Sequence, residues 1–154
     1  MNKTIVIWGA GRIGRGFVAD LFQAADYRIV FVDQSSTLIA ELNDAGSYTV
    51  VRALSANHLE KTTIRGYTAL STAQHEEVAR AVVRADLLAL AVYPKHLKAV
   101  AGDLAACLLR RREERPDAPL DILLCTNLVH AGPRFEALLK EALPAAALDY
   151  LRLR

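Results

Sequence analysis

The sequence predicts an α/β protein built on a doubly wound parallel sheet. Short runs of apolar, β-branched residues alternate with segments whose apolar residues recur at helical spacing, as in right-handed strand–helix–strand units. The strand-like runs are continuously apolar, which is expected when helices cover both faces of a sheet. A length of 154 residues, of which 53% are hydrophobic and 23% charged, suits one domain with its own core. We therefore predict a single domain over residues 1–154.

The first strand, helix and second strand fill the first 33 residues. Residues 4–8 (Thr-Ile-Val-Ile-Trp) form a β-branched apolar run that leads into a glycine-rich turn. After the turn, four apolar side chains at helical spacing predict an amphipathic helix. These are Phe17, Val18, Leu21 and Phe22. Residues 28–32 repeat the composition of a buried strand and are followed by Asp33.

The middle of the chain departs from this alternation. A helix is predicted over 36–44, with a serine as its N-cap and Gly46 as its left-handed end. Extended segments then occupy residues 48–64 on both sides of Ser55-Ala56-Asn57. They favour a β-hairpin or an excursion at the edge of the sheet.

The second half returns to alternating elements. It predicts a short helix over 76–84 and a buried strand over 86–92 that Tyr93 and Pro94 end. A long helix then runs to Pro116, and a strand over 120–125 precedes another helix. The apolar side chains that define these two helices are Leu97, Val100, Leu104 and Leu108 in the first, and Phe135, Leu138 and Leu139 in the second.

Composition and charge exclude several classes of function. Nineteen Lys and Arg against 17 Asp and Glu give a net charge of +2, too small to indicate nucleic acid or an anionic membrane as partner. The basic cluster Arg110–Arg112 is followed by acids and indicates a solvated helix end. Cys107 and Cys125 lack the spacing of a disulfide framework or metal site, and we expect both to be buried. The N-terminal apolar run is too short for a secretory signal or membrane span, so we expect a cytoplasmic protein.

A glycine-rich turn between the first strand and the first helix predicts a phosphate-binding loop. The residues Gly9, Ala10, Gly11, Arg12, Ile13 and Gly14 have the spacing G-x-G-x-x-G. Gly9 permits a tight exit from the strand, Gly11 lets the backbone approach a pyrophosphate, and Gly14 allows close packing of helix on strand. The N–H groups at the start of the helix favour an anion. Outside this strand–turn–helix context, the same spacing is also compatible with an ordinary turn.

The second strand ends in a carboxylate that predicts the nucleotide type. Asp33 lies 22 residues after Gly11, where it could accept hydrogen bonds from an adenosine ribose; the alternative is a solvated strand-end aspartate. No cation follows Asp33 to meet a 2′-phosphate, and a fixed anion repels one, so NAD is preferred to NADP. Arg12 and Arg15 flank the loop and are either phosphate ligands or solvated side chains.

Five segments occur in the same order in one enzyme family. They are Gly9–Phe17 (G-A-G-R-I-G-R-G-F), Val32-Asp33, Ser47–Val50, Ala85-Asp86 with the strand that leads to Pro94, and Leu124–Val129. The first string is far more specific than the bare glycine spacing. Together the segments resemble the mannitol-1-phosphate 5-dehydrogenases, which belong to the polyol-specific long-chain dehydrogenases.

The resemblance implies an NAD-dependent oxidoreductase whose N-terminal Rossmann domain binds NAD(H), and which interconverts mannitol 1-phosphate and fructose 6-phosphate by hydride transfer. It places Val92, Tyr93, Pro94 and Asn127 near the nicotinamide. Both segments also follow predicted strands at their carboxyl ends, where open α/β sheets bind ligands. Two residues depart from the family pattern: Tyr93 replaces a usual glycine, and Thr126 a usual glutamate.

The resemblance also implies what this chain does not contain. Family members carry the catalytic lysine, with its asparagine and histidine partners, in a second, mainly helical domain. We therefore expect no catalytic residue here, and a sugar phosphate as partner only together with that missing domain. Four basic side chains are predicted to be solvated: Lys95, His96, Lys98 and His130.

The family pattern places the end of this chain in a helix that precedes one more strand. The sheet is thus expected to lack its last strand and to expose an edge, which self-association or pairing with a catalytic fragment would cover. Our leading hypothesis is the NAD-binding domain of an oxidoreductase of this family, inactive alone. The alternative is a stand-alone, non-catalytic dinucleotide-binding or interaction module.

Overall fold

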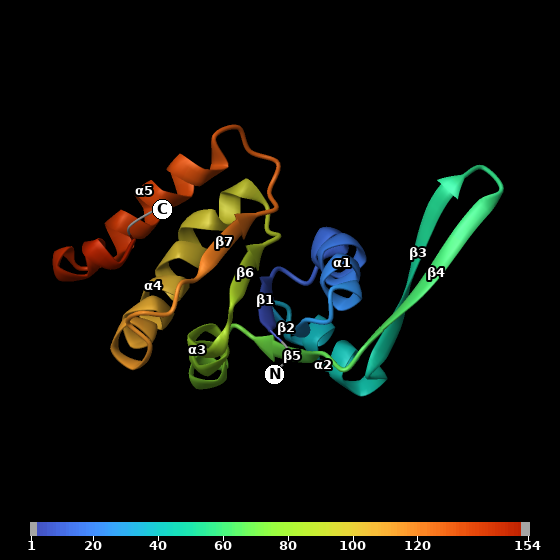
Figure 1. Cartoon of the computed structure of the whole chain (residues 1–154), viewed down its shortest axis with the longest axis horizontal. Helices are drawn as coiled ribbons and strands as arrows, with labels where there is room; N and C mark the ends of the chain where they lie inside the picture. The colour runs from blue at the N-terminus through green and yellow to red at the C-terminus, as the bar shows by residue number, and fades with distance from the viewer. Residues whose placement is uncertain (1–2, 152–154) are drawn as a thin grey trace.

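A central parallel sheet organises the computed structural model, which describes residues 3–151 (Figure 1). Its five strands lie in the order β5-β2-β1-β6-β7, and every neighbouring pair is parallel. They are β1 (Thr4–Trp8), β2 (Arg28–Asp33), β5 (Thr68–Ser71), β6 (Leu87–Leu90) and β7 (Asp121–Leu124). The chain winds outward from β1 in both directions, so the strand order reverses between β1 and β6. This confirms the predicted doubly wound class.

Helices cover both faces of the sheet. One face packs against η1 (Gly14–Val18), α1 (Ala19–Ala24) and α2 (Ser36–Ala45). The other packs against α3 (His75–Arg84), α4 (Leu97–Glu114) and α5 (Ala131–Ala142); two short 3-10 segments are η2 (Pro94–His96) and η3 (Ala145–Leu151). Strand β1 shows why its sequence is continuously apolar: Ile5 and Ile7 are buried on one face, and Val6 and Trp8 on the other.

The first helix differs from the predicted one in which side chains it buries. Helical structure starts at Arg12, passes through a π-helical turn, η1, and then becomes α1. Val18 is buried and Phe22 half-buried, whereas Phe17 and Leu21 are 59% and 50% exposed. The prediction of one apolar face was therefore wrong for half of its members, because regular helical spacing does not hold through a π turn.

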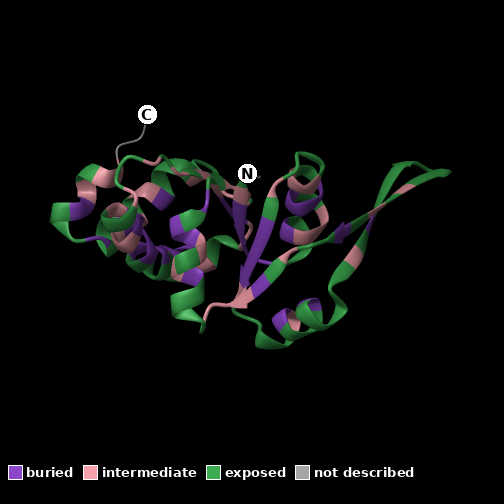
Figure 2. Cartoon of the chain, turned by 60° about the horizontal axis from the view of Figure 1, so that its bottom comes forward, coloured by how far each residue is buried: buried purple, intermediate pink, exposed green. Residues whose placement is uncertain are grey.

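The excursion in the middle of the chain is a hairpin. Strands β3 (Ser47–Ser55) and β4 (His58–Arg65) pair in an antiparallel sheet of their own, which projects from the body (Figure 1) and is mostly exposed toward its tip (Figure 2). Its base is fixed to the first helix. The Gln23 side chain donates to the Thr63 carbonyl at 2.8 Å and accepts from the Arg65 N–H at 2.9 Å.

Strand β5 was not predicted from the sequence. Thr-Ala-Leu-Ser is short and contains one large apolar residue, so its pairing with β2 comes from tertiary structure. The strand predicted over 86–92 is in fact Leu87–Leu90. The two residues after it, Ala91 and Val92, lie against the glycine loop instead.

Arg111 corrects the prediction that the basic cluster in α4 is solvated. Its side chain is completely buried. Nη1 donates to the carbonyls of Val82, Val83 and Ala85 at 2.8, 2.5 and 2.9 Å, and Nη2 to that of Pro119 at 3.0 Å. Burial lowers the pKa of Arg111. The guanidinium therefore joins the end of α3 to the segment that leads into β7.

The remaining expectations concern cysteines, membranes and metals. Cys107 is buried, and burial raises its pKa to about 11, whereas Cys125 is only half-buried. Between residues 3 and 151, no helix combines the length and apolar character needed to cross a membrane. The described residues contain no group of three or more His, Cys, Asp or Glu arranged to hold a metal ion.

Candidate functional site

Two of the three glycines in the G-x-G-x-x-G turn after β1 are required by the backbone. Gly9 has φ +102°, and a Cβ there would overlap the Ala91 carbonyl oxygen. A Cβ on Gly14 would overlap the Gly9 oxygen. Gly11 is different, because it is exposed and a Cβ there would meet nothing within 4 Å. The loop is thus tightly folded at its two ends and open in front of Gly11, where a ligand could approach the backbone.

The loop leads directly into the first helix. Helical structure begins at Arg12, and the Arg15 N–H donates to the Gly11 carbonyl at 3.0 Å. The earliest N–H groups of a helix have no partner within it, and here they lie at the carboxyl edge of the sheet. That arrangement favours a bound anion.

Asp33 points toward the glycine loop. Its Oδ2 accepts from the Ala10 N–H at 2.8 Å, and its Oδ1 accepts from the Ser35 N–H at 2.8 Å. Each carboxylate oxygen has a second lone pair available to a ribose hydroxyl. The bond to Ala10 was not foreseen, and it means that Asp33 also fixes the shape of the loop.

Arg15 fixes the loop from its other side. Its Nε donates to the Ala10 carbonyl at 2.6 Å, and its own carbonyl accepts from the Tyr48 hydroxyl at 2.8 Å. Burial raises the pKa of Tyr48, and the nearby Arg15 guanidinium opposes that rise. Arg12, by contrast, is exposed. Of the two flanking arginines, Arg15 is therefore part of the loop's support.

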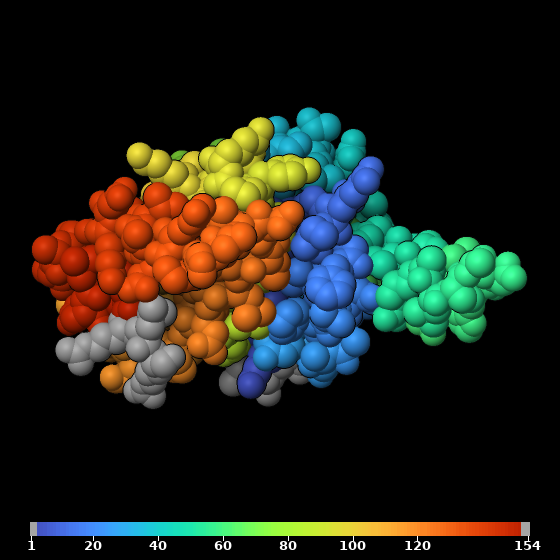
Figure 3. All heavy atoms as spheres, turned by 90° about the horizontal axis from the view of Figure 1, so that it is seen from above, coloured from blue at the N-terminus to red at the C-terminus, as the bar shows by residue number. Residues whose placement is uncertain are grey.

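The segments after β6 and β7 reach the same edge of the sheet, which Figure 3 views from above. The Ala91 N–H donates to the Trp8 carbonyl at 2.7 Å, and the Cys125 N–H to the Leu90 carbonyl at 2.9 Å. Val92 lies against Gly9, since its Cγ1 would be 3.0 Å from a Cβ there. The structure thus brings Val92 to the glycine loop and places Asn127, which is exposed, in the turn after β7.

Tyr93 and Thr126, the two departures from the family pattern, behave differently. The Tyr93 side chain is 76% exposed and does not fill the space beside Gly9, while Pro94 begins η2. The Thr126 hydroxyl is buried and has no hydrogen-bond partner among the described residues. This buried hydroxyl next to Asn127 is a free hydrogen-bonding group at this edge of the sheet.

Taken together, these residues fit a dinucleotide. The open backbone at Gly11 and the helix start suit a pyrophosphate, and Asp33 suits an adenosine ribose. The loop after β5 is joined to the end of β2, because the Thr72 N–H donates to the Asp33 carbonyl at 3.0 Å.

Known proteins resemble this chain over nearly all of its length. Residues 3–153 match the mannitol dehydrogenase Rossmann domain. The mannitol-1-phosphate 5-dehydrogenase of Lactococcus lactis subsp. lactis (strain IL1403) is 32% identical over 97% of the chain, and that of Talaromyces marneffei is 34% identical over 100%. The chain spans 38% and 39% of the length of these two relatives.

Solved structures support the fold. The TrkA-N domain of the inner membrane protein ybaL from Escherichia coli has a TM-score of 0.51 at 17% identity, covering 92% of this chain and 83% of that domain. A putative prephenate dehydrogenase from Corynebacterium glutamicum has a TM-score of 0.50 at 15% identity, covering 96% of this chain and 34% of that protein. With the family match and the glycine loop, the conclusion is that the chain belongs to the mannitol dehydrogenase family and is its NAD-binding Rossmann domain.

Proposed function

We propose that this chain is the cofactor half of an oxidoreductase that interconverts mannitol 1-phosphate and fructose 6-phosphate. The observation that carries the proposal is the position of the Asp33 carboxylate, 2.8 Å from the Ala10 N–H and beside the open backbone of Gly11. In this proposal the loop amides hold the pyrophosphate, and Asp33 holds the adenosine ribose. Val92, Tyr93, Pro94 and Asn127 line the nicotinamide end. Bound NAD supplies the hydride acceptor.

Catalysis requires groups beyond those of this chain. Removing a hydride from an alcohol carbon also requires a base for the hydroxyl proton. The family resemblance assigns that base to a lysine in a second domain, and the chain spans less than two fifths of the relatives it matches. We therefore expect NAD(H) binding without turnover. The expected source of the base is the helical half of the family's fold.

A fluorescence titration with NADH and NADPH tests the cofactor assignment. The chain is expected to bind NADH more tightly than NADPH. Asp33→Asn should weaken NADH binding by about tenfold, the equivalent of one charged hydrogen bond, and should narrow the gap between the two nucleotides. Asp44→Asn is the control, because Asp44 is an exposed carboxylate at the far end of α2. An equal loss for both nucleotides would assign Asp33 to loop structure alone.

An activity assay tests whether hydride transfer requires groups outside this chain. The chain is incubated with NAD and mannitol 1-phosphate, alone and with the C-terminal half of the Lactococcus lactis relative, and the full-length relative serves as positive control. We expect no NADH production from the chain alone. Robust turnover by the chain alone would refute the proposal that the proton acceptor lies elsewhere. NADH binding without turnover in either mixture would favour the stand-alone dinucleotide-binding module.

A further inference from the structure

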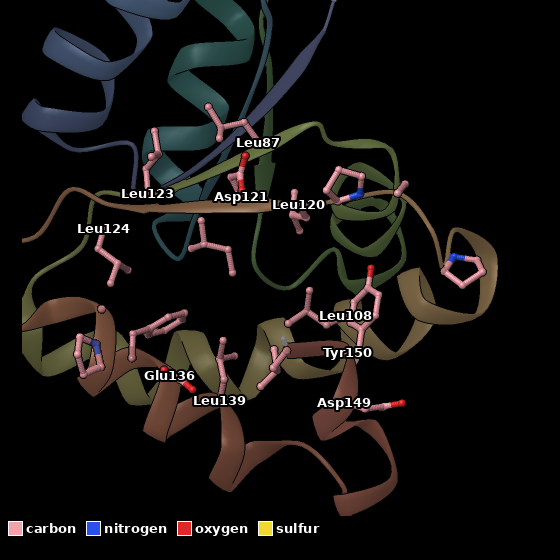
Figure 4. A pocket seen from close by; sticks show the side chains of 18 of the residues that line it. Leu87, Leu108, Leu120, Asp121, Leu123, Leu124, Glu136, Leu139, Asp149 and Tyr150 are labelled. Carbon is pink, nitrogen blue, oxygen red and sulfur yellow. The ribbon is translucent and has the colours of Figure 1, made fainter. Parts of the chain in front are cut away.

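Two cavities that lie away from the glycine loop differ in charge. The larger, of about 1170 Å³, lies between strand β7 and helix α5 (Figure 4), and its lining of described residues is largely apolar and contains no Lys, Arg or His. The smaller, of about 950 Å³, is lined by four cations and one carboxylate. These charged residues are Lys3, Arg28, Arg84, Arg115 and Asp86. We call this smaller cavity the basic pocket.

The basic pocket lies at the amino edge of the sheet, opposite the edge that carries the glycine loop. Lys3 precedes β1, Arg28 begins β2, and Asp86 precedes β6. These strands are parallel, so their starting residues lie at the same edge. The Arg28 N–H donates to the Lys3 carbonyl at 2.8 Å. The Asp86 N–H donates to the Thr4 carbonyl, also at 2.8 Å. Backbone hydrogen bonds therefore fix the spacing of the pocket across β2, β1 and β6.

Two helices bring further cations to this edge. Helices α3 and α4 each lead into a parallel strand, so both end here, with Arg84 as the last residue of α3 and Arg115 just after α4. Nη1 of Arg115 donates to the Val83 carbonyl at 3.1 Å, which joins the two helix ends. The helix dipole favours cations at helix C-termini. That preference explains Arg84 and Arg115, but not Lys3 and Arg28, which lie at the starts of strands.

The positive charge of the pocket is not neutralised by the described part of the chain. Between residues 3 and 151, the exposed side chains of Lys3, Arg28 and Arg84 make no ion pair or hydrogen bond. The carboxylate of Asp86 accepts from the Thr4 N–H at 2.8 Å. A helix C-terminus carries roughly half a negative charge, so the two helix ends and Asp86 offset about two of the four cations. A surplus of about two positive charges therefore remains in the pocket.

The size and charge of the pocket fit a small multivalent anion. Neighbouring strands lie about 4.8 Å apart, so the backbones of Arg28 and Asp86, two strands apart, are separated by about 10 Å. Linked phosphate groups could bridge that distance together with the long side chains on either side. Guanidinium groups bind phosphate through paired hydrogen bonds, and lysine binds it as a point charge. A nucleic acid would need a longer basic stripe than one pocket provides.

We propose that the basic pocket binds a small anion made of linked phosphate groups, with three or more negative charges. Lys3 and Arg28 hold one end of the anion, and Arg84 and Arg115 hold the other. The proposal does not rest on NAD binding, because the glycine loop lies at the opposite edge of the sheet. Failure of either proposal leaves the other intact.

Isothermal titration with inorganic tripolyphosphate, at low salt and in a phosphate-free buffer, tests the proposal. Saturable binding is expected. Orthophosphate should bind at least about tenfold weaker, because it engages fewer of the cations. Amide NMR shifts of the labelled chain locate the site, since the glycine loop could also attract a phosphate. The largest shifts are expected at Lys3, Arg28 and Gly66, a further residue of the lining, and not at Gly9–Gly14.

A double variant of the protein tests the same cations. Arg28→Gln with Arg84→Gln removes one cation from each side of the pocket and should raise the Kd for tripolyphosphate at least about tenfold. The matched control, Lys61→Gln with Arg134→Gln, removes the same charge from exposed positions on β4 and α5 and should change the Kd less than about twofold.

Three results would overturn the proposal. They are no saturable binding, an equal loss of affinity in the two double variants, and amide shifts at Gly9–Gly14 in place of the amino edge. Circular dichroism checks that both double variants are folded. If the pocket variant does not fold, the amide shifts of the unaltered chain decide between the two edges of the sheet.

Discussion

The centre and the margin of the sheet are built in different ways. At the centre, β1 has a strand on each side, and its glycine loop is held by Asp33 on one side and by Arg15 on the other. At the margin, β7 has a strand on one side only, and the segment before it is held by Arg111. The comparison shows that the cofactor loop is preorganised by several independent contacts. The segment ahead of β7 is held by the hydrogen bonds of one buried cation.

The largest effect is expected from Arg111→Met. The substitution removes the Arg111 hydrogen bonds to four carbonyls, and those of Ala85 and Pro119 lose their donor, so the free energy of unfolding should fall by about 4 kcal/mol. Urea denaturation measures this. Arg112→Met is the control and should cost less than about 1 kcal/mol, since Arg112 makes one exposed ion pair. Similar losses in both variants would show that burial of Arg111 does not support the margin.

Gly14→Ala is expected to lower the free energy of unfolding by less than Arg111→Met does, and also to weaken NADH binding. The new Cβ overlaps the Gly9 oxygen, and relief of that overlap should cost about 2–3 kcal/mol and displace the loop. NADH affinity should fall at least tenfold in a fluorescence titration. Gly16→Ala, two residues away, meets nothing within 4 Å and should change stability by less than about 1 kcal/mol. Unchanged NADH binding by Gly14→Ala would show that the loop is not preorganised.

The smallest expected effect is a difference in NADH affinity between variants of the two arginines beside the loop. Arg15→Gln loses the 2.6 Å bond to the Ala10 carbonyl and should raise the Kd for NADH by about fivefold, the equivalent of one hydrogen bond. Arg12→Gln removes the same charge without that bond and should change the Kd less than about twofold. Isothermal titration at fixed salt measures both. Equal changes would mean that charge, not loop support, is what Arg15 contributes.

The parallel sheet and both helix layers were predictable because their signals are local. Continuous apolar runs marked β1, β2, β6 and β7, and Gly46, with φ +64°, ends α2 as expected. Strand β5 was missed because pairing with β2 defines it better than its own composition does. The exposure of Phe17 was missed because no residue pattern announces the π turn before α1.

The site was less predictable than the fold. Glycine spacing and a strand-end carboxylate located the loop and Asp33, but the bonds from Asp33 and Arg15 to Ala10 depend on three-dimensional proximity. The burial of Arg111 could not be inferred from a run of three arginines, since its acceptors lie 26 or more residues earlier in the chain or in the loop ahead of β7. The sequence identifies residues that could bind the nucleotide or support the loop, and tertiary packing determines which of them do so.

The π turn at Gly14–Val18 also affects how this chain should be aligned with its relatives. A π turn holds one residue more than an α-helical turn. Deleting a single residue there would close the turn into a regular helix and keep the glycine loop before it in place. The two side chains after it that hold the hairpin would also stay in place: Asp20, which pairs with Arg52 of β3 at 3.3 Å, and Gln23. A relative that has one residue fewer in this helix should therefore carry the gap within the turn.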